Sequence, residues 1–103
     1  MPEISFEGIP NKIGGTKISN FYSAMRDAVV AIKTLETSKD SIALSSTFKQ
    51  ARSKRGISIR VQIISKPDVS EGVKISLERE IRKVINLFFP AEEIIHYQII
   101  ENK

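Results

Sequence analysis

Cysteine is absent from this chain of 103 residues, which also has one histidine and no tryptophan. Without cysteine there can be no disulfide framework, no thiolate nucleophile and no zinc site built from cysteine ligands. His96 alone cannot supply the two or three imidazoles that a catalytic zinc ion uses. The sequence therefore predicts neither a metal site nor a bound cofactor.

Long apolar runs are also lacking. A bilayer-spanning helix needs about 18 apolar residues, whereas the longest run here, Val84–Phe89, is short and is interrupted by Asn86. The first ten residues include Glu3 and Glu7 and have neither the basic start nor the apolar segment of a signal peptide. We therefore expect a cytoplasmic protein with no membrane partner.

Recognisable catalytic motifs are missing from the sequence as well. It contains no Gly-x-Ser-x-Gly elbow, no P-loop and no Gly-x-Gly-x-x-Gly turn. His96 has no acid or nucleophile at motif spacing, and the adjacent Glu92 and Glu93 are typical of a charged connector after Pro90. The sequence thus predicts no catalytic residues and a protein that is not an enzyme.

What remains is the composition of one small globular domain, with 41% hydrophobic and 27% charged residues. Ile4 and Phe6 alternate with polar residues, and glycines and a proline follow them. We therefore expect residues 1–18 to form a flexible N-terminal arm or an edge strand. Residues 19–103 are expected to form a single α+β domain.

Two segments have the apolar spacing of helices. Residues 20–38 place one apolar stripe on a helical face, made of Phe21, Tyr22, Met25, Ala28, Val29, Ile32 and Leu35. A second stripe begins at Val73, continues to Phe88 and ends before Pro90. Residues 73–77 also alternate as a strand would, but we favour the helix because the stripe continues through them without a change of phase.

Three segments read as strands, at residues 41–50, 57–65 and 94–100. The link at 51–56 is short and ends in glycine, which favours an antiparallel hairpin between the first two strands. The expected fold is a ferredoxin-like two-layer sandwich of βαββαβ or αββαβ order, with both helices on one face of an antiparallel sheet. Its outer face would carry polar residues: Thr47, Lys49, Ser58, Arg60, Gln62, His96 and Gln98.

Positive charge is concentrated on this predicted hairpin. Residues 41–67 contain six basic and no acidic residues, whereas the rest of the chain has ten basic and twelve acidic ones, so the net charge of +4 lies entirely on the hairpin. A cationic loop of this kind can contact nucleic-acid phosphates. Exposed hairpin tips also favour charge for solubility, and basic residues there discourage aggregation.

From this charge we predict a small, non-catalytic module that binds RNA or DNA. The phosphate contacts would come from Lys49, Arg52, Lys54, Arg55 and Arg60, with secondary contacts from Lys12, Lys17 and Lys66. The alternative is a protein–protein interaction or assembly subunit that pairs with itself or another protein through the sheet face or a sheet edge.

Overall fold

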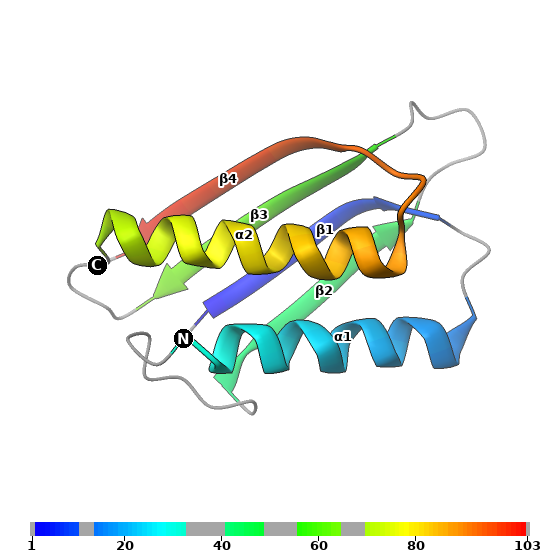
Figure 1. Cartoon of the computed structure of the whole chain (residues 1–103), viewed down its shortest axis with the longest axis horizontal. Helices are drawn as coiled ribbons and strands as arrows, with labels where there is room; N and C mark the ends of the chain where they lie inside the picture. Colours follow the sequence, from blue (N-terminus) through cyan, green and yellow to red (C-terminus); the bar gives the residue numbers. More distant parts are fainter. Residues whose placement is uncertain (1, 11–13, 33–40, 49–55, 65–69, 103) are drawn as a thin grey trace.

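The computed structural model describes residues 2–10, 14–32, 41–48, 56–64 and 70–102. These contain four strands and two helices, in the order β1 (Pro2–Ile9), α1 (Gly15–Val30), β2 (Ala43–Phe48), β3 (Ile57–Ile64), α2 (Glu71–Phe88) and β4 (Ile94–Asn102). The strands form one sheet in the order β2-β1-β3-β4 (Figure 1).

The sheet is built from two β-α-β units. Strands β1 and β2 are parallel with α1 between them in sequence, and β3 and β4 are parallel with α2 between them. Parallel neighbours cannot be joined by a tight turn, so a helical crossover connects each pair. The two units meet at the antiparallel pair β1–β3 in the middle of the sheet.

The prediction of a ferredoxin-like sandwich with an antiparallel sheet is therefore wrong. The sheet is mixed, and β2 and β3, which we expected to pair as a hairpin, are separated by β1. Alternating hydrophobicity fixes which side chains face the core, but it does not identify the neighbouring strand. Of the residues between these two strands, 49–55 lie outside the described part of the chain.

Strand β1 lies inside the sheet, where a flexible arm or an edge strand had been expected. It pairs with β2 on one side and β3 on the other, and Ile4, Phe6 and Ile9 are fully buried. The segment 1–18 also contributes the first turn of α1, since that helix begins at Gly15. The start of the chain is thus part of the core.

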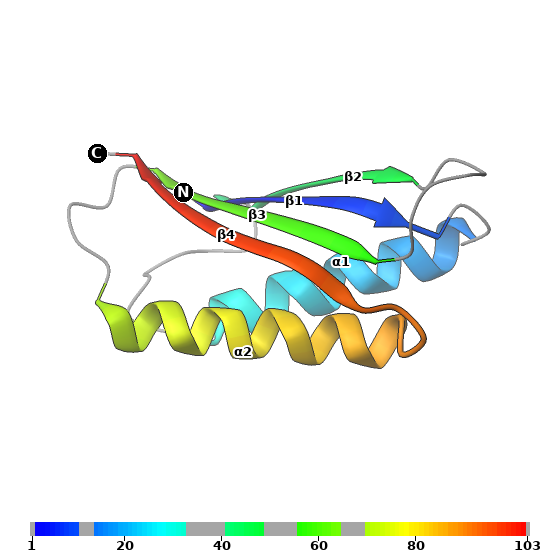
Figure 2. The ribbon, with the colours of Figure 1, turned by 90° about the horizontal axis from the view of Figure 1, so that it is seen from above.

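Both helices cover the same face of the sheet (Figure 2). The core between the layers is apolar, and Phe21 lies at its centre, with its ring 5.1–5.6 Å from those of Phe6, Phe88 and Phe89. Such edge-to-face contacts are a preferred arrangement of aromatic rings. The side chains contributed by the two helices hold them against this face, and no other element that the structure describes covers the opposite face of the sheet.

Helix α2 confirms that residues 73–77 are helical. Ser70 caps its N-terminus by accepting a hydrogen bond from the Val73 backbone N–H at 3.3 Å. None of the helices described is long and apolar enough to cross a membrane.

Two glycines allow the strands to approach closely at one end of the sheet. Gly8 and Gly56 have φ angles of +88° and +126°, a region that side chains rarely adopt. A Cβ at Gly8 would overlap the Gly56 carbonyl oxygen, and one at Gly56 would overlap the Ile95 side chain. The register of β1 against β2 shifts beside Gly8, and that of β3 against β4 shifts beside Ile57.

Candidate functional site

The sheet face without helices, called here the open face, carries polar side chains in cross-strand rows. In one row Ser5 of β1 is opposite Ser45 of β2 and Arg60 of β3. The next row consists of Thr47, Glu7, Ser58 and His96, from β2, β1, β3 and β4. Because strand side chains alternate, the residues between them point into the core and leave these two rows on one surface.

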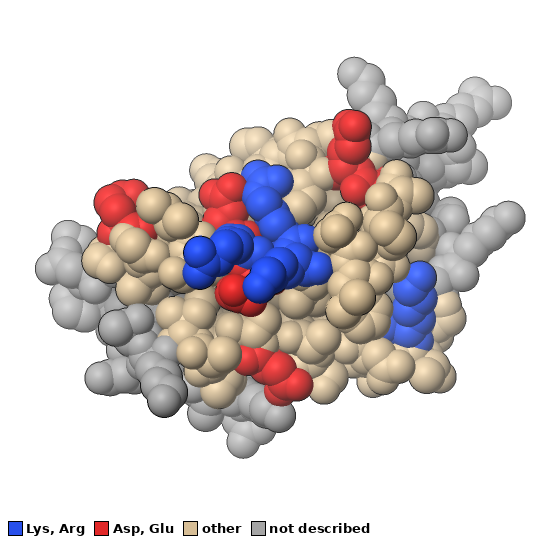
Figure 3. Space-filling view, in the orientation of Figure 1, with Lys and Arg blue, Asp and Glu red and all other residues tan. Residues whose placement is uncertain are grey.

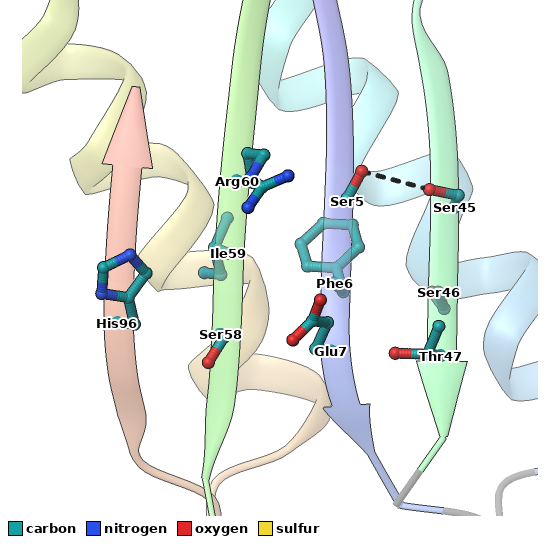
Figure 4. Close-up of a pocket in the computed structure, with 10 residues that line it drawn as sticks. All are labelled: Ser5, Phe6, Glu7, Ser45, Ser46, Thr47, Ser58, Ile59, Arg60 and His96. Carbon is teal, nitrogen blue, oxygen red and sulfur yellow. Dashed lines mark hydrogen bonds between the residues drawn. The ribbon is translucent and has the colours of Figure 1, made fainter. Parts of the chain in front are cut away.

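A hollow of about 320 Å³ lies over these rows. We call it the open-face hollow, and its lining residues come from all four strands: Ser5, Phe6, Glu7, Ser45, Ser46, Thr47, Ser58, Ile59, Arg60 and His96. Figure 4 shows that the side chains of Arg60 and Glu7 both extend over the space between β1 and β3. The hollow is therefore centred on the middle pair of strands.

Hydroxyl groups surround the two charged side chains. The Ser45 hydroxyl donates a hydrogen bond to the Ser5 hydroxyl at 3.3 Å, shown as a dashed line in Figure 4. Ser58 and Thr47 are the cross-strand neighbours of Glu7. The site thus offers a guanidinium that only donates hydrogen bonds, a carboxylate that accepts them when ionised, and hydroxyls that do both.

The second row contains a carboxylate, a hydroxyl and an imidazole, but not in the order of a hydrolytic triad. Ser58 lies between Glu7 and His96, whereas a triad needs the histidine between the acid and the serine. No metal-binding group of three or more acidic or histidine side chains occurs among the residues described. The chemistry that this surface offers is recognition of small polar ligands and proton exchange.

A bulge in β4 decides which of its residues reach the open face. Ser58 is opposite His96 while Ile57 is opposite Ile94, so Ile95 is skipped in the register and is 55% exposed. His96 and Gln98 lie on the open face as expected, and Tyr97 packs against the core. Ile94, on the other side of the bulge, packs against the core.

The structure describes two of the predicted phosphate-binding residues, Arg60 and Lys17, and of these two Arg60 lines the hollow. Lys17 lies in α1, on the helix side, with its ammonium 5.3 Å from the centre of the Phe89 ring. The other six lie outside the described residues: Lys12, Lys49, Arg52, Lys54, Arg55 and Lys66. Sequence reasoning missed Ser5 and Glu7; their alternation with Ile4 and Phe6 was visible, but the central place of β1 was not.

Charged side chains of α2 gather on the helix side of the molecule (Figure 3). There the Arg82 and Glu78 side chains of α2 are 2.8 Å apart, and Lys83 and Glu80 are 3.7 Å apart. Pairs spaced three or four residues apart on an exposed helix stabilise it by a few tenths of a kcal/mol. Helix stability therefore accounts for these charged side chains of α2.

Tyr97 is the described residue with a strongly shifted pKa. Burial against α2, with a smaller contribution from Glu78, raises the pKa of its phenol well above the usual value. The hydroxyl is buried and has no hydrogen-bond partner among the described residues, and the Arg82 guanidinium lies 5.8 Å from the ring centre. Tyr97 faces the helices and takes no part in the open-face hollow.

No protein-family model and no curated protein matches the sequence. Solved structures do match the fold. A symmetric trimer of fused 4-OT (4-oxalocrotonate tautomerase) has a TM-score of 0.74 at 11% identity over 98% of this chain and 84% of its own. Pt0534 inactivated by 2-oxo-3-pentynoate has a TM-score of 0.72 at 14% identity, again over 98% and 84%. Malonate semialdehyde decarboxylase, solved as wild type, as an inactivated enzyme and as a mutant with its N-terminal proline changed to alanine, has a TM-score of 0.64 at 14% identity over 97% and 84%.

These structures correct the functional predictions made from charge. A non-catalytic module that binds nucleic acid, and the prediction that the protein is not an enzyme, are both wrong, because the fold is shared with tautomerases and a decarboxylase. An RNA or DNA partner is likewise unsupported. The chain has the β-α-β fold of tautomerase-type enzymes.

Proposed function

We propose that this protein is an enzyme that moves a proton at a carbon next to the carbonyl group of a small carboxylic acid. The observation that carries the proposal is the fold, which matches tautomerase-type enzymes over nearly the whole chain. Two of these structures are named for short acids, malonate semialdehyde and 2-oxo-3-pentynoate. Both acids combine a carboxyl group with a carbonyl, so we take this as the substrate class.

Pro2 is the residue that we propose as the general base. The decarboxylase was also solved with its N-terminal proline changed to alanine, and in this chain a proline follows the first methionine. If Met1 is removed, Pro2 has a free secondary amine at the start of β1, where its register partner is Ile63. An α-amino group has a pKa of about 7.7–8.0, close enough to neutral for a fraction to be unprotonated and to accept a proton.

Proton exchange tests the activity directly. The protein is incubated in D₂O with 2-oxopentanoate, and loss of the proton signal at C3 is followed by NMR. We expect faster exchange than in buffer alone, and a loss of about 10²-fold or more when a tag fused before Met1 keeps the Pro2 nitrogen in an amide bond, because that fold-change is the contribution typical of general acid–base catalysis. Exchange at the buffer rate would refute the proposed activity.

A covalent label tests the role of Pro2 separately. The amine of Pro2 should add to the alkyne of 2-oxo-3-pentynoate, so that a C–N bond forms, a proton is taken up at carbon, and the mass increases by one whole molecule. Mass spectrometry of the intact protein shows whether Met1 is absent and whether one label is bound, and the masses of peptides from a digest show whether the label is at Pro2. A variant with a tag fused before Met1 is the control, because an amide nitrogen is neither basic nor nucleophilic. Labelling of this control to the same extent would exclude Pro2 as the reactive group.

We also infer that the protein self-associates through its sheet edges. Among the strands that the structure describes, β2 and β4 each have a neighbour on one side only, and exposed strand edges can pair with another chain. The two edges differ, so β2 of one copy pairing with β4 of the next is a head-to-tail contact that can close into a ring. The name of the fused 4-OT structure describes a symmetric trimer, which favours three copies.

Light scattering tests this assembly. We expect three times the chain mass for the wild type, and a smaller mass for Phe48→Lys, because Phe48 is 50% exposed at the end of β2 and charge at an edge opposes pairing. A monomer at all concentrations would rule the assembly out. The cytoplasmic location expected from the sequence remains a prediction.

A further inference from the structure

The open-face hollow has the volume and the polar lining of a small-molecule site, and it lies away from Pro2, the proposed general base. Small-molecule sites occupy about 300–1,000 Å³, and this hollow, at about 320 Å³, suits a compound of few heavy atoms. Pro2 precedes Ser5 by three residues on β1, a distance of roughly 10 Å along a strand. A small ligand in the hollow therefore contacts other residues than a substrate that reacts at Pro2.

Arg60 supplies the positive end of the hollow. Its guanidinium presents five donors and no acceptor, which suits a carboxylate bound through two parallel hydrogen bonds. Among the residues described, no acidic side chain forms an ion pair with Arg60. Ser5 is its cross-strand neighbour on one side and Gln98 on the other, so polar groups flank it without neutralising it.

Glu7 supplies the opposite end. It is exposed, and its carboxylate lies one row away from Arg60, because the register partner of Glu7 is Ser58 and not Arg60. Diagonal neighbours in an antiparallel pair are about 7–8 Å apart. The two charged groups can therefore contact the two ends of one small molecule, provided that the end near Glu7 donates a hydrogen bond.

We propose that the open-face hollow binds a small hydroxycarboxylate. Arg60 binds the carboxylate group, and Glu7 accepts a hydrogen bond from a ligand hydroxyl. The hydroxyls of Ser5, Ser45, Thr47 and Ser58 bind the remaining oxygens. The proposal goes beyond the proposed function and does not depend on it, since neither the Pro2 amine nor any reaction is involved.

Three probes separate the contributions of the two ends. Glycerate has a carboxylate and hydroxyls, propionate has the carboxylate alone, and glycerol has hydroxyls alone. Each is titrated into isotope-labelled protein, and backbone amide shifts are followed by NMR. We expect shifts centred on Ser5, Glu7, Ser58 and Arg60, and glycerate affinity at least about tenfold above that of either other probe, since each charge-assisted contact contributes about that factor.

Variants then assign the contacts to residues. Arg60→Gln should weaken glycerate binding about tenfold or more, Arg60→Lys should weaken it less, and Glu7→Gln should reduce the preference for glycerate over propionate. Arg79→Gln is the matched control, because Arg79 is an exposed arginine of α2 on the opposite side of the molecule, and it should bind like the wild type. Melting temperatures confirm that each variant is folded.

Three outcomes would overturn the proposal. Equal glycerate affinity of Arg60→Gln and Arg79→Gln would exclude Arg60 as the carboxylate contact. Equal affinity for all three probes would mean that no hydroxycarboxylate is recognised. Shifts at the hollow that follow protein concentration without any probe would show that the open face is an interface between copies instead. Because binding is measured without turnover, a protein with a tag fused before Met1 that is inactive but still binds glycerate would separate this site from the proposed activity.

Discussion

Replacing Gly8 with alanine tests how the two β-α-β units are held together. Gly8 has a φ of +88°, and a Cβ there would overlap the backbone carbonyl oxygen of Gly56. An alanine forced into this region costs about 1–3 kcal/mol, and displacing packed backbone costs about 1–3 kcal/mol more. The expected loss in the free energy of unfolding is thus about 2–6 kcal/mol, against a total of about 5–15 kcal/mol for a domain.

Thermal and denaturant unfolding measure this loss. For a domain of this size, 1 kcal/mol corresponds to a shift in melting temperature of about 4–8 °C, so Gly8→Ala should melt at least about 8 °C below the wild type. Gly15→Ala is the matched control, because a Cβ at the first residue of α1 meets no atom within 4 Å. Alanine there should be neutral or stabilise the protein by about 0.4–1 kcal/mol.

The comparison of the two glycines can refute the reasoning. If Gly8→Ala melts within about 2 °C of Gly15→Ala, the close approach of Gly8 to Gly56 does not constrain the sheet, and the expected strain of about 1–3 kcal/mol is absent. If both variants lose the same large amount, the effect comes from alanine itself and not from the geometry at the end of β1.

Three further substitutions test the core, the helix cap and the buried phenol. Phe21→Ala removes the ring at the centre of the aromatic cluster and should cost about 3–5 kcal/mol in the free energy of unfolding, measured by urea denaturation. Ser70→Ala removes the cap of α2 and should cost about 0.5–2 kcal/mol, whereas an unchanged midpoint would show that the cap is dispensable. Tyr97 has its pKa raised by burial, so the stabilisation from its neutral phenol is complete below the unfolded pKa of about 10 and is lost as the pH rises further. Tyr97→Phe should flatten this alkaline decline in melting temperature and leave the neutral-pH stability equal or higher, because a buried hydroxyl without a partner is removed.

The sequence predicted the positions of most helices and strands better than it predicted which strands pair. The stripe from Val73 to Phe88 predicted α2, because one face of a helix must be apolar to pack on the sheet. The alternation of β3 and β4 located both strands. Neither pattern could show that β1 lies between β2 and β3, since strand pairing depends on contacts far apart in sequence and the link at 51–56 resembled a hairpin turn.

The candidate site was visible only in part for the same reason. Thr47, Ser58, Arg60 and His96 were expected on the outer face and do line the open-face hollow. Glu7 lies beside these residues because β1 is in the middle of the sheet, and the alternation of apolar and polar residues does not predict that position. Pro2 was overlooked because the chemistry proposed for it comes from a backbone nitrogen, and a search for reactive side chains passes over it.

The two β-α-β units are related by an approximate half-turn, but the side chains at the two ends of the sheet differ. Strands β1 and β3 have the same length, and Ser5 of one is opposite Arg60 of the other, so a half-turn about an axis between these two residues exchanges the halves of the molecule. That half-turn carries the row containing Glu7 onto a row of quite different character: Ala43, Glu3, Gln62 and Ile100. If the two halves were separate chains of identical sequence, the two ends of the sheet would carry the same side chains. Because both halves belong to one polypeptide, their sequences can differ, and of these two rows the one with Glu7 contains an imidazole and hydroxyls while the other contains neither.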